Sequence, residues 1–285
     1  MEHRPSSPDV TSSHDPGPAP DSPAPAPPLS PRPRLGVFKF ASCSGCQGVL
    51  LGCEDELLAI ADAVEIAHFP EASTRLAEEG PFHVALVEGS VSAPEHLEQI
   101  REIRERSKVL VSIGACATSG GLQALRNFGD SEEYARRIYA HPEYLATLET
   151  STPIADHVEV DYELRGCPIN QRQLLELLTA VLKGRRPEIR NESLCLGCKR
   201  WGYVCVMVAH GIPCLGPVTV NGCGAVCPSM GRGCYGCFGP KEGANTEALA
   251  QRMLEMGIAE EEVLRAFRFI TGYAEAFRNE SLRHE

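Results

Sequence analysis

The sequence predicts an α/β fold in which a doubly wound parallel sheet is followed by a small, irregular or helical domain rich in cysteine. Two observations predict it. Between residues 35 and 186, short apolar runs alternate with segments of helical apolar spacing, the pattern of a parallel sheet covered by helices. Between Cys195 and Cys237, eight cysteines fall within 43 residues, a density typical of a metal-binding or disulfide-linked domain.

The first 34 residues differ in composition from the rest of the chain. They contain eleven of its 22 prolines and few large apolar residues. Such a segment cannot bury enough apolar surface to fold, so we expect a disordered, proline-rich leader at residues 1–34. This leaves the sheet domain at 35–186 and the cysteine-rich domain at 187–285. The leader shows no apolar core of an export signal, which favours a cytoplasmic location.

Composition also excludes classes of partner. The net charge is −11 and no basic run is present, which argues against nucleic acid and anionic membranes. No apolar stretch approaches about 18 residues, so we expect no membrane span.

Five apolar runs predict the strands, and periodic segments predict the helices. The strands are expected at residues 35–40, 64–69, 83–89, 108–115 and 157–164. Helices are expected at 47–63, 94–107 and 169–184. Beyond the cysteine-rich segment, 246–257 and 259–273 predict two amphipathic helices followed by a polar tail.

Four cysteines lie just past the ends of predicted strands. Cys43 and Cys46 follow the first strand, Cys116 the fourth and Cys167 the fifth. The carboxyl ends of parallel strands meet at one edge of a sheet, which is where such sheets bind ligands. We therefore expect the four thiols to converge there, with neighbouring glycines allowing a bulky group to approach.

Alternatives remain for these cysteines taken singly. Cys43 and Cys46 form a CxxC pair that also suits a thioredoxin-like dithiol. Cys116 alone would suit a small buried apolar side chain. Cys53 lies within the first predicted helix and is interpreted as structural.

The eight clustered cysteines could form disulfides, bind zinc or bind iron–sulfur clusters. Disulfides require an oxidising compartment, for which no signal is visible. The CxxC pairs at Cys195 and Cys234 suit either zinc or an iron–sulfur cluster. The Cys-Pro pairs at Cys167 and Cys227 favour iron–sulfur, because Cys-Pro often ends a run of cluster ligands. The residues alone leave zinc as the rival.

Four short motifs carry a family resemblance. The strings FKFASCSGCQGVLL, VEGSV, SIGACATSGG and RGCPIN, in this order, resemble the small subunit of [NiFe] hydrogenases. The later run from CLGC to CFGP resembles the soluble, pyridine-nucleotide-linked branch, whose small subunit is also called the sulfhydrogenase delta subunit. The resemblance covers residues 35–275. A complex I subunit of the same superfamily would instead have adjacent Cys-Cys ligands and would lack the eight-cysteine domain.

The resemblance implies a flavodoxin-like first domain and three [4Fe–4S] clusters, with no catalytic residue on this chain. We name the three implied ligand groups the proximal set (Cys43, Cys46, Cys116 and Cys167), the distal set (Cys195, Cys198, Cys205 and Cys214) and the medial set (Cys223, Cys227, Cys234 and Cys237). Glu88 of the VEGS motif is expected near the proximal cluster. Cys195 stands where many relatives have histidine. Local order and resemblance alone divide the eight clustered cysteines into these two sets.

The implied function is that of an electron-transferring subunit of an H2:NAD(P)+ oxidoreductase. A large subunit would hold the nickel–iron site, and a diaphorase with FAD and NAD(P), together with iron–sulfur subunits, would complete a cytoplasmic heterotetramer. Two alternatives stay open. One is a small subunit that serves heterodisulfide reductase or a coenzyme F420 module. The other, from a different class of protein, is a zinc-stabilised interaction module.

Overall fold

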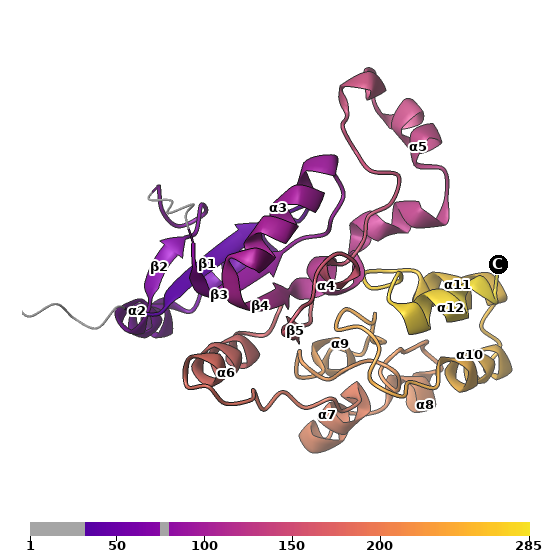
Figure 1. Ribbon diagram of the computed structural model, residues 1–285. Helices are drawn as coiled ribbons and strands as arrows, with labels where there is room; N and C mark the ends of the chain where they lie inside the picture. Colours follow the sequence, from indigo (N-terminus) through magenta and orange to yellow (C-terminus); the bar gives the residue numbers. More distant parts are fainter. Residues whose placement is uncertain (1–31, 75–79) are drawn as a thin grey trace, which may run out of the picture. The chain divides into compact units, whose positions relative to one another are not determined.

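Five parallel strands form the central sheet of the computed structural model, which describes residues 32–74 and 80–285 (Figure 1). Their order is β2-β1-β3-β4-β5, the flavodoxin-like arrangement. The strands are β1 (Arg34–Lys39), β2 (Glu65–His68), β3 (Phe82–Glu88), β4 (Ser107–Ile113) and β5 (Tyr162–Leu164). The predicted doubly wound parallel sheet is therefore confirmed. Almost all of the predicted leader lies outside the described residues.

Helices pack on both faces of the sheet, as the apolar patterns of the strands require. One face carries α1 (Gly45–Leu51), α2 (Glu54–Ala63) and α6 (Gln171–Leu182), whose buried side chains include Leu50, Leu174 and Leu178. The other face carries α3 (Pro94–Glu105) and α4 (Gly114–Ser119), where Ile100 and Ala117 pack against Val87 and Leu110. Burial on both faces explains why β3 and β4 read as continuous apolar runs.

The register of the strands aligns their carboxyl ends. Lys39 at the end of β1 pairs with Glu88 at the end of β3. Glu88 in turn pairs with Ile113 of β4, and Ile113 pairs with Leu164 of β5. The loops that follow these strands consequently leave the sheet side by side.

The predicted helix at 47–63 is in fact two helices. The chain breaks at Gly52 and Cys53, where Glu54 adopts a left-handed backbone with φ of 42°. This break turns the Cys53 side chain into the core, where it is fully buried. The helical spacing was therefore predicted correctly, whereas the prediction of a single continuous helix was wrong.

The fifth strand is also shorter than the predicted 157–164. At its start, the Asp161 carboxylate accepts a hydrogen bond from the Leu110 N–H at 2.8 Å and pairs with Arg104 at 2.6 Å. A side chain thus takes the place of a strand partner, so regular pairing begins only at Tyr162.

Sequence periodicity indicated no elements between residues 120 and 150, yet this segment is partly helical. It contains η1 (Leu122–Phe128), α5 (Ser131–Ile138) and η2 (Pro142–Tyr144), and a further turn, η3 (Ile154–Asp156), leads back to the sheet. Figure 1 shows α5 standing clear of the other helices.

The cysteine-rich segment has only short helices, α7 (Leu194–Trp201), α8 (Val206–His210) and α9 (Val226–Ser229). Three further helices complete the chain: α10 (Thr246–Glu255), α11 (Glu260–Phe267) and α12 (Glu275–Leu282). The first two of these were predicted. The prediction of a polar tail is wrong, because Phe277 and Ser281 of α12 are buried against α11 and its surroundings.

Residues Arg32–Glu285 form one compact unit, and the expected division at residue 186 stays a prediction. Among the described residues, no helix is both long and apolar enough to cross a membrane.

Candidate metal centres

The proximal set is delivered by three loops at the aligned edge of the sheet. After β1, Ser44 adopts a left-handed backbone, which lets the chain turn so that α1 begins directly between Cys43 and Cys46. Cys116 lies in the first turn of α4, immediately after β4. Cys167 follows β5 by three residues. Strand register thus positions four cysteines that lie far apart in sequence.

The four thiols surround one site, which we call the proximal pocket, and influence one another's pKa values. Burial, together with the neighbouring Glu88, Cys116 and Cys167, raises the pKa of Cys46 to about 12, although a hydrogen bond with the backbone of Ile169 acts in the opposite direction. Burial also raises the pKa of Cys116 to about 11, with contributions from Cys167 and Cys43. Such thiols stay protonated at neutral pH unless a positive centre binds them, as a metal cluster does. Cys43 and Cys167 are exposed, so the pocket opens to the surface.

Glycines lie beside the sulfurs of this pocket, at positions where any side chain would collide with them. A methyl group on Gly114, whose φ is 85°, would overlap Cys46 Sγ. A methyl group on Gly121, with φ of 65°, would lie 2.7 Å from Cys116 Sγ. The absence of side chains at these positions leaves room around the sulfurs for a group larger than a single ion.

Glu88 lies where the family resemblance implies, beside the proximal set. It is only 2% exposed. Its carboxylate accepts hydrogen bonds from the N–H groups of Cys46 at 3.2 Å and Gln47 at 3.4 Å. Burial raises the pKa of Glu88, while these two N–H donors act in the opposite direction. The carboxylate therefore anchors the start of α1 and orients Cys46.

Gln123 is a neighbour of the proximal set that sequence reasoning missed. Its amide donates to the Ala41 carbonyl at 2.7 Å and lies 3.5–3.6 Å from Cys116 Sγ. Because it comes from η1, no spacing within the cysteine motifs could have indicated it.

Cys53 stays outside this pocket. Its thiol is fully buried and donates to the Val49 carbonyl at 3.3 Å. Burial raises its pKa, and the next contribution comes from Glu56 rather than from another cysteine. Its surroundings are those of a core side chain, in agreement with the structural interpretation.

The distal set gathers around α7 and α8. Cys195 and Cys198 lie one turn apart in α7, and Cys205 precedes α8. Burial, together with the neighbouring Cys214, Cys198 and Cys205, raises the pKa of Cys195 to about 11. Cys214 is buried, and its sulfur accepts hydrogen bonds from the N–H groups of Cys234 at 3.1 Å and Gly216 at 3.4 Å.

The medial set gathers around α9 and the loop that follows it. Burial, together with the neighbouring Cys223, Cys167 and Cys227, raises the pKa of Cys237 to about 12. The pKa of Cys227 is likewise raised by burial and by Cys223. The Cys234 sulfur accepts a hydrogen bond from the Gly236 N–H at 3.4 Å. The structure thus places these four thiols near one another.

The medial set has neighbouring cysteines in both of the other sets. Cys167 of the proximal set is among the neighbours that raise the pKa of Cys237. On the other side, Cys223 acts on Cys198, and Cys214 acts on Cys227. These pair effects link the proximal set to the medial set and the medial set to the distal set.

Three groups of four thiols fit iron–sulfur clusters better than single ions. Within the described ranges, no three His, Cys, Asp or Glu side chains are close enough together to hold one metal ion. In a [4Fe–4S] cluster each cysteine binds a different iron atom, so its ligands stand further apart than those of one zinc ion. All thirteen cysteines are free thiols.

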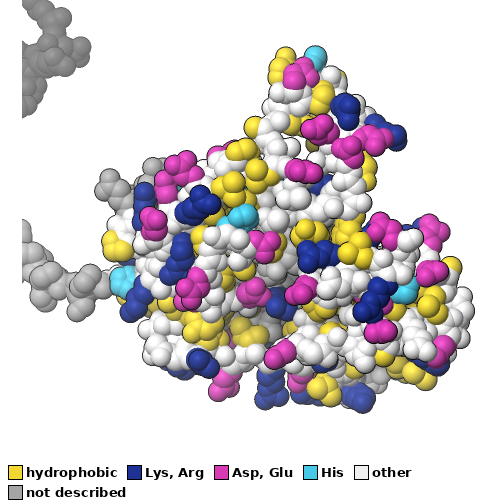
Figure 2. All heavy atoms as spheres, turned by 45° about the vertical axis from the view of Figure 1, so that its right-hand side comes forward, with side chains coloured by type: hydrophobic (Ala, Val, Ile, Leu, Met, Phe, Trp, Pro, Cys, Tyr) yellow, Lys and Arg dark blue, Asp and Glu magenta, His cyan; other side chains and the backbone are white. Residues whose placement is uncertain are grey.

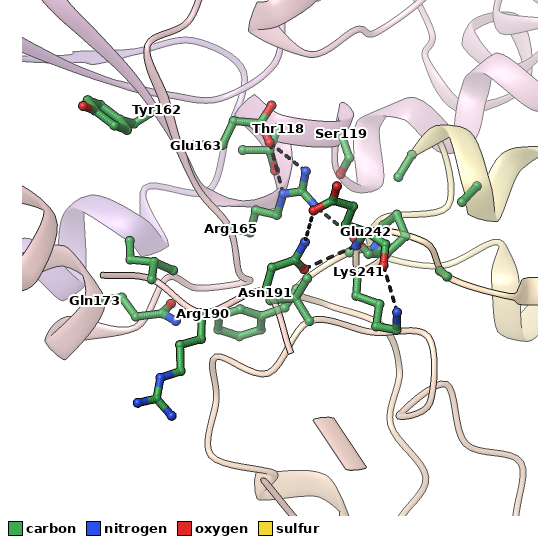
Figure 3. Close-up of a pocket in the computed structure, with 18 of the residues that line it drawn as sticks. Thr118, Ser119, Tyr162, Glu163, Arg165, Gln173, Arg190, Asn191, Lys241 and Glu242 are labelled. Atoms are coloured by element: carbon green, nitrogen blue, oxygen red, sulfur yellow. Dashed lines mark hydrogen bonds and ion pairs between the residues drawn. The ribbon is translucent and has the colours of Figure 1, made fainter. Parts of the chain in front are cut away.

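A separate cleft of about 1040 Å³ lies between β5 and the loop after Cys237 (Figure 3). Arg165 reaches across its wall, pairing with Glu163 at 2.9 Å and donating to the Pro240 carbonyl at 2.8 Å. Asn191 and Glu242 are hydrogen-bonded at 3.2 Å on the same wall. Arg165 therefore ties the loop of Cys167 to the loop of Cys237. Sequence reasoning did not identify this residue.

Comparisons with known proteins agree with the geometry. Residues 43–181, which contain the whole proximal set, match the family described as NADH ubiquinone oxidoreductase, 20 Kd subunit. The chain is 38% identical over 235 residues to sulfhydrogenase 2 subunit delta of Pyrococcus furiosus, covering 82% of this chain and 98% of that one. It is 32% identical to a chain of the F420-non-reducing hydrogenase of Methanocaldococcus jannaschii, covering 72% and 81% of the two chains.

A solved structure shows the same relationship. The chain is similar to one from the crystal structure of NAD+-reducing [NiFe]-hydrogenase in the H2-reduced state, with a TM-score of 0.51 and 32% identity. The similarity covers 56% of this chain and 96% of that chain.

Proposed function

The chain belongs to the family of [NiFe] hydrogenase small subunits, and we propose that it conducts electrons through three [4Fe–4S] clusters between a large subunit and an NAD(P)-reducing module. The large subunit would hold the nickel–iron site that splits or forms H2. This chain would supply no catalytic residue. Its cysteines would bind the clusters, which supply reversible one-electron transfer when present.

The observation that carries this proposal is the link between the three thiol sets through neighbouring cysteines. An electron conduit requires its redox centres to lie in sequence through the protein, and the medial set has neighbouring cysteines in both of the other sets, which supports this order. The proximal set, at the sheet edge, would face the large subunit. The distal set would face the electron acceptor.

Protein groups around the sulfurs would adjust the reduction potentials. Hydrogen bonds from N–H groups to cluster-binding sulfur raise the potential, because they stabilise the additional negative charge of the reduced state. Cys214 accepts two such bonds and Cys234 accepts one. Burial of these two cysteines keeps water from the same sulfurs.

The acceptor is proposed from the named relatives. The matched solved structure is an NAD+-reducing enzyme, which supports a diaphorase with FAD and NAD(P), further iron–sulfur subunits and a heterotetrameric, cytoplasmic enzyme. The alternative acceptors are heterodisulfide reductase and a coenzyme F420 module. The similarity to a chain of an F420-non-reducing hydrogenase favours the first of these two over the second.

Metal analysis tests the cluster count. The anaerobically purified chain should contain about 12 iron and about 12 acid-labile sulfide, four of each per cluster. Two equivalents of zinc without sulfide would instead identify the rival, a zinc-stabilised interaction module. About eight iron atoms would show that one set does not assemble a cluster.

Co-purification from the native host tests the acceptor. A tag on this chain should retain a large subunit with nickel, together with a subunit that contains FAD and reduces NAD+ or NADP+ with H2. Recovery of a heterodisulfide reductase in place of the flavin-containing diaphorase would replace the proposed acceptor and leave the conduit intact.

A further inference from the structure

Residues 129–147 form a projecting arm, and no side chain of its helix is buried. The arm contains α5 and η2, and none of the residues in these two elements is buried. Its apolar side chains are nevertheless large, and Ile138 and Tyr144 are 73% and 79% exposed. Figure 2 shows the arm standing above the body of the molecule, with hydrophobic side chains on its surface. The exposed group is completed by Tyr134, Tyr139 and Leu145.

The base of the arm is rigidly attached. The guanidinium of Arg126 donates to the carbonyls of Leu148 at 2.8 Å and Thr150 at 3.1 Å, which joins the two ends of the excursion. Asn127 and Ser151 exchange hydrogen bonds of 2.7 and 2.8 Å. These hydrogen bonds hold the two ends of the arm together, so its base is well ordered.

Helix α5 of the arm has local hydrogen bonds, but these contribute little to its stability on their own. Asp130 accepts hydrogen bonds from the N–H groups of Glu132 and Glu133, which caps α5. Glu133 also pairs with Arg137 one turn later. A helix of eight residues is marginal in water even with such support, so packing on another surface is the expected source of its stability.

The arm is coupled to the proximal set. Its base includes η1, whose Gln123 contacts Cys116 Sγ and the Ala41 carbonyl beside Cys43. Cys43 and Cys167 are exposed at this edge, so a partner that covers the proximal pocket would also meet the arm. Figure 1 places α5 at the opposite end of the molecule from α7 and α8, which carry the distal set.

From these observations we infer that the arm is a docking element for the hydrogenase large subunit. Its apolar side chains would be buried by that subunit, and its rigid base would hold the proximal pocket against the same surface. The inference rests on the proposed function, because the partner is the protein that exchanges electrons with the proximal cluster. Aromatic and aliphatic side chains that are exposed in a single subunit often become the buried centre of an interface when subunits assemble.

Co-expression with an affinity-tagged large subunit tests the inference. The double variant Ile138→Glu/Tyr144→Glu should reduce the amount of this chain retained by the tagged subunit at least tenfold. The matched control is Leu58→Glu, because Leu58 is a 66% exposed leucine on α2, outside the arm. The control should be retained like the unaltered chain. Equal retention of the double variant and the control would overturn the inference.

Photo-crosslinking identifies the occupant directly. In the assembled enzyme, p-benzoylphenylalanine at position 144 should form an adduct with the large subunit, whereas the same group at position 58 should not. An adduct only with a diaphorase subunit, or only with a second copy of this chain, would overturn the choice of partner. If the unaltered chain itself contains no iron or retains no large subunit, the proposed function fails instead, so the two failures are distinguishable.

Discussion

The proximal set and the eight clustered cysteines reach similar arrangements by different means. The proximal thiols come from loops on a sheet whose core consists mainly of strand and helix side chains such as Val84, Leu86 and Val111, and Cys46 is the one proximal thiol that belongs to this core. The clustered cysteines come from a segment with three short helices, and two of them, Cys214 and Cys234, are part of the apolar core itself. The first site thus depends mainly on a sheet built from other side chains, whereas the second lies in a segment with little regular structure of its own.

This difference has an energetic meaning. Binding of a metal centre stabilises whichever folded state presents its ligands, and this stabilisation matters most where few other contacts exist. Helices α10, α11 and α12 supply the C-terminal part with a small core of its own. The loops between residues 202 and 240 depend on that core and, we expect, on the clusters.

The largest expected effect comes from removal of iron. Anaerobic chelation should expose the amides of residues 202–240 and raise their hydrogen-exchange rates about a hundredfold or more, since the free energy of local opening decreases there. Amides of β3 and β4 should keep their protection because the sheet core does not involve iron. Mass spectrometry of exchanged peptides measures both regions in one sample. Loss of protection across the sheet to the same degree would show that the two regions do not differ in this way.

The next effect separates function from fold at the proximal set. Cys116→Ala should lower iron from about 12 to about 8 per chain and stop H2-driven dye reduction, because one cluster is lost. Circular dichroism and the medial and distal cluster signals should remain. Cys53→Ala is the matched control, since Cys53 is buried near the same sheet but donates to the Val49 carbonyl, and no cysteine influences its pKa. It should keep all of the iron. Unchanged dye reduction in Cys116→Ala would refute the assigned role.

The outcome of sequence prediction follows the same division. Strand positions and the edge location of Cys116 and Cys167 could be predicted because parallel strands share one direction and one edge. The break at Gly52 and Cys53 could not be predicted, because it leaves the helical period of the apolar residues almost intact. Gln123 and Arg165 were missed for a related reason: both act through contacts with distant loops.

The arm and α12 were missed because the usual signals are absent or misleading. The arm has no face that is buried within this chain, so its apolar residues do not follow the spacing expected of a helix that packs on a core. The last helix, α12, is largely polar in sequence, but its buried Phe277 packs against Phe267, with ring centroids 5.6 Å apart.

A smaller effect tests whether the space around the proximal thiols matters. Gly114→Ala places a methyl group on Cys46 Sγ in addition to straining a left-handed backbone. It should lose up to about four iron atoms per chain. Gly184→Ala is the control, because Gly184 has a similar φ of 67° but no atom near the added methyl group. The control should cost about 1–2 kcal/mol of the free energy of unfolding and keep its iron. Equal iron in both variants would show that the pocket tolerates the added group.

The smallest effect concerns acid sensitivity of the sheet region that is independent of any cysteine. Burial lowers the pKa of His96, whose Nδ1 accepts a hydrogen bond from the Ser92 N–H at 3.2 Å. The unfolded chain binds a proton at this residue below about pH 6.5, before the folded chain does, so stability is complete above that pH and decreases below it. Between pH 7.5 and 5.5, the melting temperature of His96→Gln should therefore fall by about 1–2 °C less than that of the unaltered protein. His141→Gln, which changes an exposed histidine, should match the unaltered protein. Identical pH dependence in His96→Gln would show that protonation of His96 does not contribute to the acid sensitivity of the protein.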